Sequence, residues 1–357
     1  MNPFAISHRL PAEWEPQEST CIAWPHRQAT WPGHFGPVPA VYARVAALVA
    51  RHQRVWIVAS GEALVEARDR LGGVDRVGFL DIPTSDGWIR DSGPVILVPR
   101  VQRDGPARIP SDAPTQPGEV AVCFAFNAWG GKYPPWELDA AVSGRVAEKL
   151  GLPAVRPGFV LEGGAIETDG AGTLIVNRRC VIDPARNPGL SEAEAERRFA
   201  EWLGIERVIW IDGVLAGDDT DGHVDQVARF VAPGRVAIAR QSDRTDPNHE
   251  ILEALADSLS RGRDARGSRL ELIHIDIPSR YERHGVQLPA SHLNFLITNG
   301  SVLVPVFGCT TDDQAMVTLE GCFRGRTIEP VDSSDLIWGR GAVHCMTRDQ
   351  PAWRITS

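Results

Sequence analysis

The hydrophobic positions of this chain follow a short sequence pattern that occurs five times. A glycine or another small residue is followed by one further residue and then by three or four apolar or β-branched positions that end in a turn. Short apolar runs of this kind are typical of buried strands. The pattern predicts five strands in equivalent places, at Ser19–Pro25, Gly93–Val98, Gly172–Asn177, Gly234–Ala239 and Gly300–Pro305.

A helical pattern follows each predicted strand. Two of the helices also carry start signals, because Ser191 with Glu194 and Thr311 with Gln314 have the spacing of a capping box. The helix after Ser191 is expected to end at Gly204. The apolar positions that predict the helices are Val41, Val45, Leu48 and Val49, the run Glu137–Leu150, then Phe199, Trp202 and Leu203, and then Ile251, Leu252 and Leu255.

A further strand-like run follows several of these helices, at Val55–Val58, Val208–Ile211 and Leu272–Ile275. The chain is therefore predicted to be built from five ββαβ units. Five units close more easily into a ring than into an open row, which would leave two apolar ends uncovered. We predict a single α/β domain over residues 1–357 with the architecture of a five-bladed propeller. The alternative is a two-domain α/β protein whose hairpins are similar by accident.

Composition narrows the class of protein. The chain of 357 residues is 43% hydrophobic and 23% charged, which is typical of a globular protein with a large core. The net charge of −9 argues against a nucleic-acid partner. No segment resembles a secretion signal or a membrane helix, so we expect a cytoplasmic protein without a membrane partner. The Pro- and Gly-rich run Pro99–Pro117 predicts an irregular surface loop.

Polar segments precede four of the five strands and should gather at one end of a ring. Cys345 would take the matching place before the first strand once the ring closes. The six cysteines have no C-x-x-C spacing, and we expect Cys21, Cys123, Cys180 and Cys322 to be small buried apolar residues. The polar segments are Trp88–Pro94, Leu161–Gly164, Asp218–Asp225 and Ser291–Asn294.

Taken singly, each polar side chain has an ordinary structural explanation. Asp91 could form a surface ion pair, Glu162 could be a turn residue, and His223 could be a hydrogen-bonded core histidine. Together, Asp91, Glu162 and Asp225 would make a confined, strongly negative site that needs a cation. The planar guanidinium group pairs well with carboxylates because its N–H donors are fixed in a fork.

A thiol and an imidazole beside such a cation suggest covalent chemistry. Thiolate of Cys345 would attack the guanidinium carbon, and His223 would protonate the departing ammonia and later deprotonate the hydrolytic water. Asp91 and Asp225 would hold the guanidinium nitrogens, whereas Glu162 could orient either His223 or the substrate. The carboxylates should raise the pKa of Cys345, so the bound cation would help to ionise the thiol.

Ordered motifs along nearly the whole chain resemble the family of agmatine deiminases and bacterial-type peptidylarginine deiminases, in the guanidine-modifying pentein superfamily. The motifs are Leu10–Gln17, Trp24–Pro25, Trp88–Pro94, Phe126–Tyr133, Leu161–Gly164, Asp219–Asp225, Asn294–Phe295 and Val343–Thr347.

The resemblance implies a five-bladed propeller without a metal or organic cofactor, in which Cys345 is the nucleophile and His223 the general acid and base. It implies that agmatine is converted to N-carbamoylputrescine and ammonia, in polyamine synthesis, and that the protein could be a homodimer. We further expect substrate contacts within these motifs, from Trp88, Arg90, Trp129, Gly164, Asp221 and Asn294.

Two positions depart from the family pattern. Gly308–Thr311 stands where the family usually has Gly-Asp-Pro, which leaves the role of Cys309 open. The nucleophile loop contains Arg340 between two glycines; its side chain could pair with a structural carboxylate or could recognise a carboxylate on a substrate.

Other functions are compatible with parts of the pattern. The substrate could be peptidyl-arginine or another guanidino compound, and the propeller could bind such a ligand without turning it over. A metallohydrolase could use His223, Asp225 and Asp91 as ligands. A thiol amidase would need oxyanion donors rather than three carboxylates.

Overall fold

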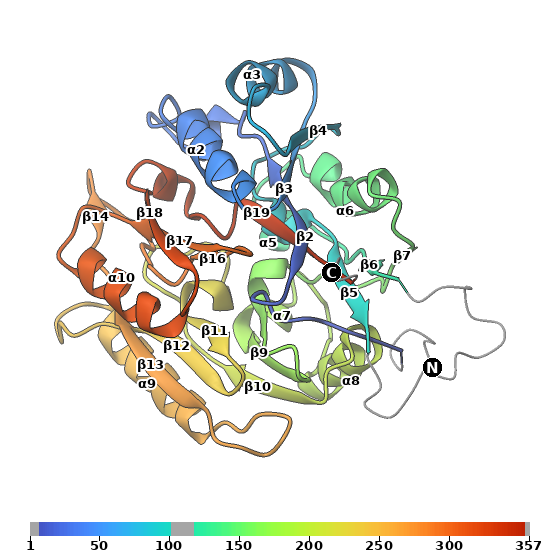
Figure 1. Cartoon of the computed structure of the whole chain (residues 1–357). Coiled ribbons are helices and arrows are strands. Elements are labelled where there is room, and N and C mark those ends of the chain that lie inside the picture. Colours follow the sequence, from blue (N-terminus) through green and yellow to red (C-terminus); the bar gives the residue numbers. More distant parts are fainter. Residues whose placement is uncertain (1–6, 101–117, 354–357) are drawn as a thin grey trace.

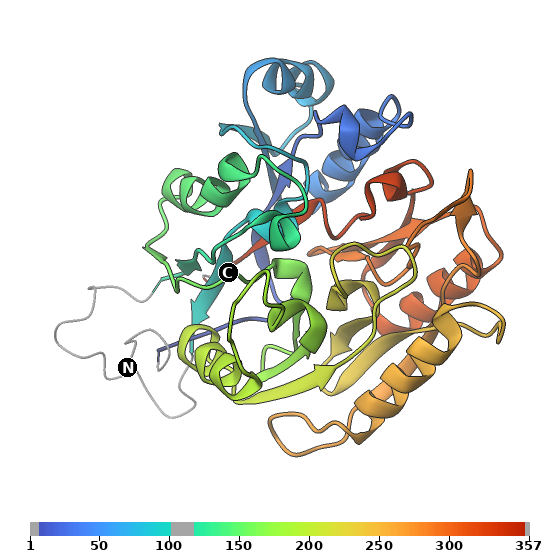
Figure 2. The same cartoon turned by 180° about the vertical axis from the view of Figure 1, so that it is seen from behind.

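The computed structural model describes residues 7–100 and 118–353. Within them the strands form five sheets of three or four strands and one short hairpin. Figures 1 and 2 show the five sheets around the middle of the molecule, with the long helices on the outside. The predicted loop Pro99–Pro117 lies outside the described residues, apart from its first two positions.

Three of the sheets repeat one ββαβ pattern. In each, the first two strands are antiparallel, a helix follows, and the third strand returns parallel to the second. The first unit contains β8 (Ile166–Thr168), β9 (Thr173–Asn177), α8 (Glu192–Leu203) and β10 (Arg207–Ile211). The second contains β11 (Ala228–Ala232), β12 (Arg235–Arg240), α9 (Asn248–Arg261) and β13 (Glu271–Asp276). The third contains β16 (Leu296–Ile297), β17 (Ser301–Val306), α10 (Thr311–Cys322) and β18 (Thr327–Asp332).

The other two sheets vary this pattern. One has the order β1–β5–β6–β7, with β1 (His8–Arg9), β5 (Val95–Pro99), β6 (Val120–Val122) and β7 (Ala154–Val155), and its helix is α6 (Glu137–Lys149). The other has the order β19–β2–β3–β4, with β19 (Thr347–Pro351), β2 (Gln17–Ala23), β3 (Arg54–Ala59) and β4 (Val77–Asp81), and its helices are α2 (Val38–Ala50) and α3 (Gly61–Leu71). The C-terminal strand therefore completes the sheet of the N-terminal unit.

Short elements connect the units. They are the helices η1 (Gln28–Thr30), α4 (Ile89–Ser92), α5 (Ala128–Gly131), η2 (Gly163–Ala165), α7 (Arg178–Val181), η3 (Val224–Gln226) and η4 (Leu336–Gly339), and the hairpin strands β14 (Glu282–Arg283) and β15 (Val286–Gln287).

All five predicted strands and the helices after them are present, but the second strand was aligned incorrectly. Gly93–Val98 corresponds to β5, the first strand of its unit, whereas the other four copies correspond to the second strand. The equivalent second strand is β6, whose own apolar run, residues 120–126, is not included among the five copies. With this correction every polar segment directly precedes the first strand of a unit, which is why these segments converge.

Two capping predictions have different outcomes. The Ser191 side chain accepts a hydrogen bond from the amide of Glu194, and the helix ends at Gly204 with a left-handed backbone (φ 70°). The Glu194 carboxylate, however, pairs with Arg197 and Arg198 instead of returning to Ser191. The second capping box is wrong, because α10 starts at Thr311 itself and no side chain caps it.

The apolar faces of the helices form the main cores between helices and sheets. Helix α9 buries Leu252, Leu255 and Leu259, and α8 buries Phe199 and Leu203. Complete burial of one such side chain contributes about 1.5–3 kcal/mol. None of the helices in the described ranges is long and apolar enough to cross a bilayer.

A buried arginine links its own unit to three other units. Arg229 of β11 has no exposed side-chain surface. It donates to Glu167 of β8 (2.9 Å), to Glu13 before β2 (3.0 Å) and to the main-chain oxygens of Leu293 (3.2 Å) and Phe295 (2.6 Å). Every direction of the guanidinium fork is therefore occupied by a different segment.

We predict that Arg229→Met lowers the free energy of unfolding by about 3–5 kcal/mol, because two buried carboxylates lose their cation. Urea denaturation measures the change. The matched control is Arg235→Met on the neighbouring strand, where the exposed pair with Glu271 contributes less than about 1 kcal/mol. Equal effects of the two substitutions would contradict a central role for Arg229.

Candidate active site

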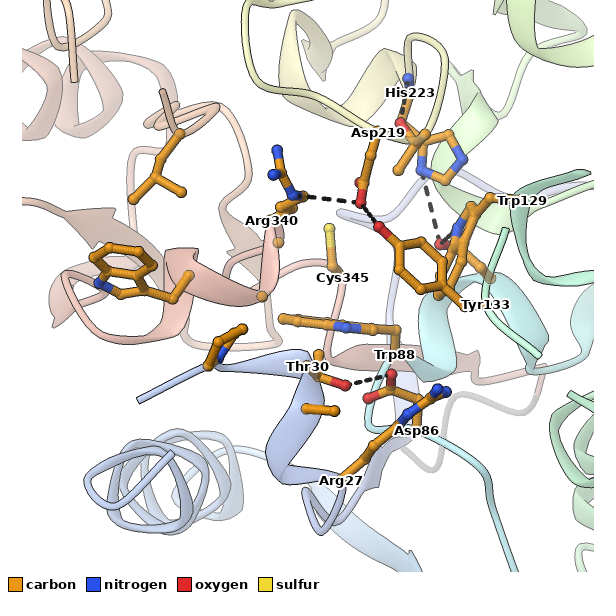
Figure 3. Close-up of a pocket in the computed structure, with 18 of the residues that line it drawn as sticks. Arg27, Thr30, Asp86, Trp88, Trp129, Tyr133, Asp219, His223, Arg340 and Cys345 are labelled. Carbon is orange, nitrogen blue, oxygen red and sulfur yellow. Dashed lines mark hydrogen bonds and ion pairs between the residues drawn. The ribbon is translucent and has the colours of Figure 1, made fainter. Parts of the chain in front are cut away.

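A cavity of about 470 Å³ opens where the polar segments converge. Its wall contains Asp91, His223 and Cys345 together with the rings of Trp88 and Trp129. Figure 3 shows the sulfur of Cys345 between the indole of Trp88 on one side and the Asp219–Arg340 pair on the other. The five residues predicted to carry the chemistry lie in and directly behind this wall.

The Cys345 loop is shaped by one asparagine. Oδ1 of Asn294 accepts hydrogen bonds from the amides of Ala342 (3.1 Å), His344 (3.1 Å) and Cys345 (3.3 Å). Its Nδ2 lies 3.2 Å from Sγ of Cys345. Because Asn294 is fully buried behind the loop, its contacts here are with the nucleophile segment, and it does not line the cavity.

His223 is held at one nitrogen and free at the other. Nε2 lies 2.8 Å from Oε2 of Glu162, and Oε1 of Glu162 accepts from Nε of Arg186 at 2.8 Å. Nδ1 has no hydrogen-bond partner and lies 3.7 Å from Oδ2 of Asp91. Of the two roles left open for Glu162, the contacts match that of orienting His223.

Two buried ion pairs set opposite pKa shifts around this imidazole. Burial would raise the pKa of Glu162, but the hydrogen bond to His223 and the charge of Arg186 lower it to about 2. Burial would lower the pKa of His223, but the carboxylate of Asp91 and the contacts with Cys180 and Glu162 raise it well above its ordinary value. His223 is therefore an imidazolium at neutral pH, and its buried Nδ1 carries a proton on the side of Asp91.

Asp91 and Asp225 differ in how they are held. Asp91 accepts from the amide of Gly164 (2.9 Å) and from Nε1 of Trp129 (3.0 Å), and burial raises its pKa. Oδ2 of Asp225 lies 2.7 Å from Nδ1 of His344 and 3.8 Å from Sγ of Cys345, whereas its buried Oδ1 has no partner.

The thiol of Cys345 is protonated in this environment. Burial raises its pKa well above the ordinary value, and the negative charges of Asp225 and Asp91 raise it further. This agrees with the expectation that a bound cation is needed to ionise the thiol.

Gly164 belongs to the site through its lack of a side chain. A Cβ at this position would lie 2.5 Å from Nδ1 of His223 and 3.1 Å from Oδ1 of Asp91. Only glycine allows the two groups to approach the main chain this closely, so Gly164 acts through packing and lies outside the cavity wall.

Two residues expected to contact a substrate lie away from the cavity. Arg90 is buried against Asp349 (2.8 Å) and the main-chain oxygen of His344 (3.2 Å), so its charge is directed away from the cavity. Asp221 pairs with Lys132 (2.5 Å) and Arg186 (2.7 Å) and does not line the cavity either. Trp88 and Trp129 are both in the wall, as expected.

Arg340 pairs with a carboxylate of the protein itself, which is the first of the two alternatives considered for its side chain. Its Nε lies 3.5 Å from Oδ2 of Asp219, and its Nη1 donates to the main-chain oxygen of Gly217. Asp219 also accepts from the hydroxyl of Tyr133.

Several residues of the site were missed from the sequence. His344 and Glu13 lie inside motifs that were recognised, but nothing in the pattern separated them from their neighbours. Gln226, whose Nε2 lies 3.9 Å from Sγ of Cys345 and whose Oε1 is buried without a partner, follows Asp225 directly. Arg186 gave no signal at all.

The cysteines expected to be apolar core residues need two corrections. Cys180 is buried, but its Sγ also lies 3.3 Å from Oε2 of Glu162. Cys322 is only half-buried. Cys21 and Cys123 are buried as expected.

The ligand set of the alternative metallohydrolase, His223, Asp225 and Asp91, differs from the cluster found among the described residues. The possible ligand atoms that cluster around His223 belong to Glu162 and Cys180.

Residues 9–351 match the model of the family described as Porphyromonas-type peptidyl-arginine deiminase. The chain belongs to this family. An agmatine deiminase of Pseudomonas aeruginosa (strain LESB58) is 35% identical, over 99% of this chain and 98% of the relative.

Solved structures of family members have the same α/β fold. An agmatine deiminase of Enterococcus faecalis superposes with a TM-score of 0.88 at 28% identity, covering 99% of this chain and 98% of the other. A cysteine-to-serine variant of the agmatine deiminase of C. jejuni, with substrate bound, superposes with a TM-score of 0.84 at 25% identity, covering 96% of each chain.

We predict that Glu162→Gln lowers the free energy of unfolding at neutral pH by about 3 kcal/mol, from the shift of the Glu162 pKa from 4.5 to about 2. A depressed carboxylate pKa stabilises the folded state above the unfolded pKa. The difference between variant and wild type should therefore be complete above pH 4.5 and shrink as pH falls towards 2. Chemical denaturation at several pH values measures it.

The matched control for this prediction is Glu192→Gln, which removes an exposed carboxylate from a pair with Arg178. Its effect should be small at every pH. In Glu162→Gln the pKa of His223, followed by NMR of the imidazole protons, should also fall. An unchanged His223 pKa would contradict the orientation and charge role of Glu162.

Proposed function

We propose that this protein hydrolyses the guanidinium group of agmatine to N-carbamoylputrescine and ammonia through a covalent intermediate on Cys345. The observation that carries the proposal is a pair of buried acceptor positions beside the thiol, Oδ1 of Asp225 and the Asp91 carboxylate, neither of which is bound by an arginine or lysine among the described residues. The His223 imidazolium lies 3.7 Å from Oδ2 of Asp91. The identity of 35% with an agmatine deiminase over nearly the full chain supports it.

Substrate binding would supply the missing cation. Asp91 and Asp225 accept N–H groups from opposite sides of the planar guanidinium, and the indole of Trp88 offers a flat wall beside it. The guanidinium carbon then faces Sγ of Cys345. The positive charge also stabilises the thiolate, and the thiol proton leaves to solvent.

Attack of the thiolate forms the S–C bond and a tetrahedral adduct. The imidazolium of His223 gives its Nδ1 proton to one amino nitrogen of the adduct. The C–N bond then breaks, ammonia leaves, and a positively charged thiouronium remains on Cys345. Neutral His223 next removes a proton from water, and the oxygen attacks the same carbon. The S–C bond then breaks, the second proton of the water passes to solvent, and the ureido product is released.

Glu162 and Asn294 would be positioning residues in this cycle. Glu162 keeps Nε2 of His223 occupied, so only Nδ1 exchanges protons with the substrate. Asn294 fixes the three amides around Cys345 and donates to the sulfur, which favours its anionic form.

The outer part of the cavity favours a substrate without a carboxylate. Arg340 lies 3.5 Å from Asp219 and donates to the main-chain oxygen of Gly217, so its charge is already partly compensated. Asp86, which also lines the cavity, adds a further negative group for the terminal ammonium of agmatine. Peptidyl-arginine, the substrate class in the family's name, is the second candidate.

We also propose that residues 1–357 form one domain and that the five sheets are the blades of a closed α/β propeller. The pairing of β19 with β2 supports closure, because it joins the two ends of the chain in one sheet.

Turnover of agmatine, free arginine and a blocked peptidyl-arginine tests the function. We expect ureido product from agmatine with at least about 100-fold higher kcat/KM than from the other two, because ΔΔG‡ of about 2.7 kcal/mol is the scale of one lost ion pair. Activity should vanish in Cys345→Ser, persist in Cys322→Ser and survive a chelator. No product from any of the three substrates would refute the deiminase.

Alkylation tests the state of the thiol. Because the pKa of Cys345 is raised, neutral iodoacetamide should label it slowly at pH 7, whereas a cationic haloacetamidine that fits between Asp91 and Asp225 should label it much faster. Peptide mass spectrometry measures both rates. In Asp225→Asn the preference for the cationic reagent should shrink; an equal preference in this variant would contradict the carboxylate cradle.

A further inference from the structure

A second cluster of metal-binding side chains lies where the turn before β16 meets the start of α10. Its members are His292, Cys309 and Asp312, whose ligand atoms all lie within 4.8 Å of one another. Sγ of Cys309 is 3.0 Å from Oδ1 of Asp312, and Nε2 of His292 is 3.7 Å from the same oxygen. Tetrahedral zinc sites place mixed N, O and S donors about 3.2–3.8 Å apart, so little movement would bring these atoms onto one ion.

The imidazole of His292 is oriented for coordination. Its Nδ1 lies 2.9 Å from the main-chain oxygen of Pro305. A carbonyl oxygen only accepts, so Nδ1 carries the hydrogen and Nε2 keeps its lone pair. That nitrogen faces the hydroxyl of Thr311 at 3.0 Å, on the side of the cluster. Metal-binding histidines typically have their second nitrogen fixed by a carbonyl in this way.

The other two ligands are also held in place. The carboxylate of Asp312 accepts from the amides of Phe307 (3.2 Å) and Cys309 (3.1 Å), and the thiol of Cys309 points to the same carboxylate. Cys309 and Asp312 are half-buried, whereas His292 is completely buried. An ion can therefore reach the cluster from solvent without disturbing the fold.

The three side chains also offer donor types that zinc binds, an imidazole nitrogen, a thiol sulfur and a carboxylate oxygen. The hydroxyl of Thr311 lies 3.1 Å from Sγ of Cys309 and 3.0 Å from Nε2 of His292, so it faces the same space.

We propose that His292, Cys309 and Asp312 bind one divalent metal ion of the zinc class, with water as the fourth ligand. Formation of the metal–sulfur bond releases the Cys309 proton to solvent, and the other two ligands bind without losing a proton. The bound ion ties α10 to the turn that carries Asn294, two residues after His292. The site is separate from the catalytic thiol.

The cluster of Glu162, Cys180 and His223 is a weaker candidate for the same ion. There the carboxylate already pairs with Arg186 and with the imidazolium. A dication would have to displace one cation and approach another. At the His292 cluster the structure places no such cationic side chain on the ligand atoms among the described residues.

Cobalt titration of the purified full-length protein tests the site, because thiolate ligation gives Co²⁺ a near-ultraviolet charge-transfer band. We expect the band to saturate at one equivalent of Co²⁺ and to be lost in Cys309→Ser. The matched control is Cys322→Ser, which removes a half-buried thiol at the other end of α10 and should leave the band intact. A band that persists in Cys309→Ser, or that is lost in Cys180→Ser, would overturn the assignment.

A second measurement needs no substitution. Zn²⁺ at ten times its dissociation constant should slow iodoacetamide labelling of Cys309 about tenfold in the unaltered protein, by mass action. Labelling of Cys322 should not change. Equal labelling of Cys309 with and without Zn²⁺ would refute the site. Neither readout uses agmatine turnover, so failure here and failure of the proposed deiminase are distinguishable.

Discussion

The constraint on which the rest of the structure depends is the placement of buried negative charge. Arg229 forms ion pairs with Glu13 and Glu167. Glu13 is also hydrogen-bonded to Nε2 of His344, and Nδ1 of His344 is hydrogen-bonded to Asp225. Burial would raise the pKa of Glu13, but Arg229 and His344 outweigh it and hold the pKa well below its ordinary value. This chain of contacts fixes the N-terminal segment, two sheets and the nucleophile loop relative to one another.

The same arrangement divides the carboxylates of the candidate active site into two kinds. Glu162 has its own cation in Arg186 and remains charged without a ligand. Asp91 and Asp225 contact hydrogen-bond donors but no arginine or lysine among the described residues, so the space between them favours a cation from outside. In the proposed mechanism the thiol of Cys345 lies beside that space and stays protonated until the space is filled. Selectivity for a cationic substrate and activation of the thiol would then have one physical cause.

Precision at the site comes from main-chain contacts. Asn294 fixes three amides of the Cys345 loop, and Gly164 lets His223 and Asp91 approach the backbone more closely than any side chain would allow. The Cys345 loop precedes β19, whereas Asn294 lies in the turn before β16. The position of Cys345 therefore depends on contacts between two units of the fold. The proposed metal ion would join the same turn to α10.

The repeating strands and helices could be predicted from the sequence, because their apolar runs are local and periodic. The sequence also singled out Cys345, His223, Asp91, Glu162 and Asp225 as candidates, since residue types that can do this chemistry stand at corresponding places in the repeats, and the structure brings the five side chains together.

Only the tertiary structure decided which side each polar side chain faces. Arg90 and Asp221 lie within the recognised motifs, yet both form ion pairs inside the protein. Arg90 pairs with Asp349, and Asp221 pairs with Lys132 and Arg186. Arg186 and Glu13 became visible as supporting residues only when segments distant in the chain were brought together. Ion pairing between distant segments leaves no periodic trace in a single sequence, because any position that reaches the partner can supply the charge.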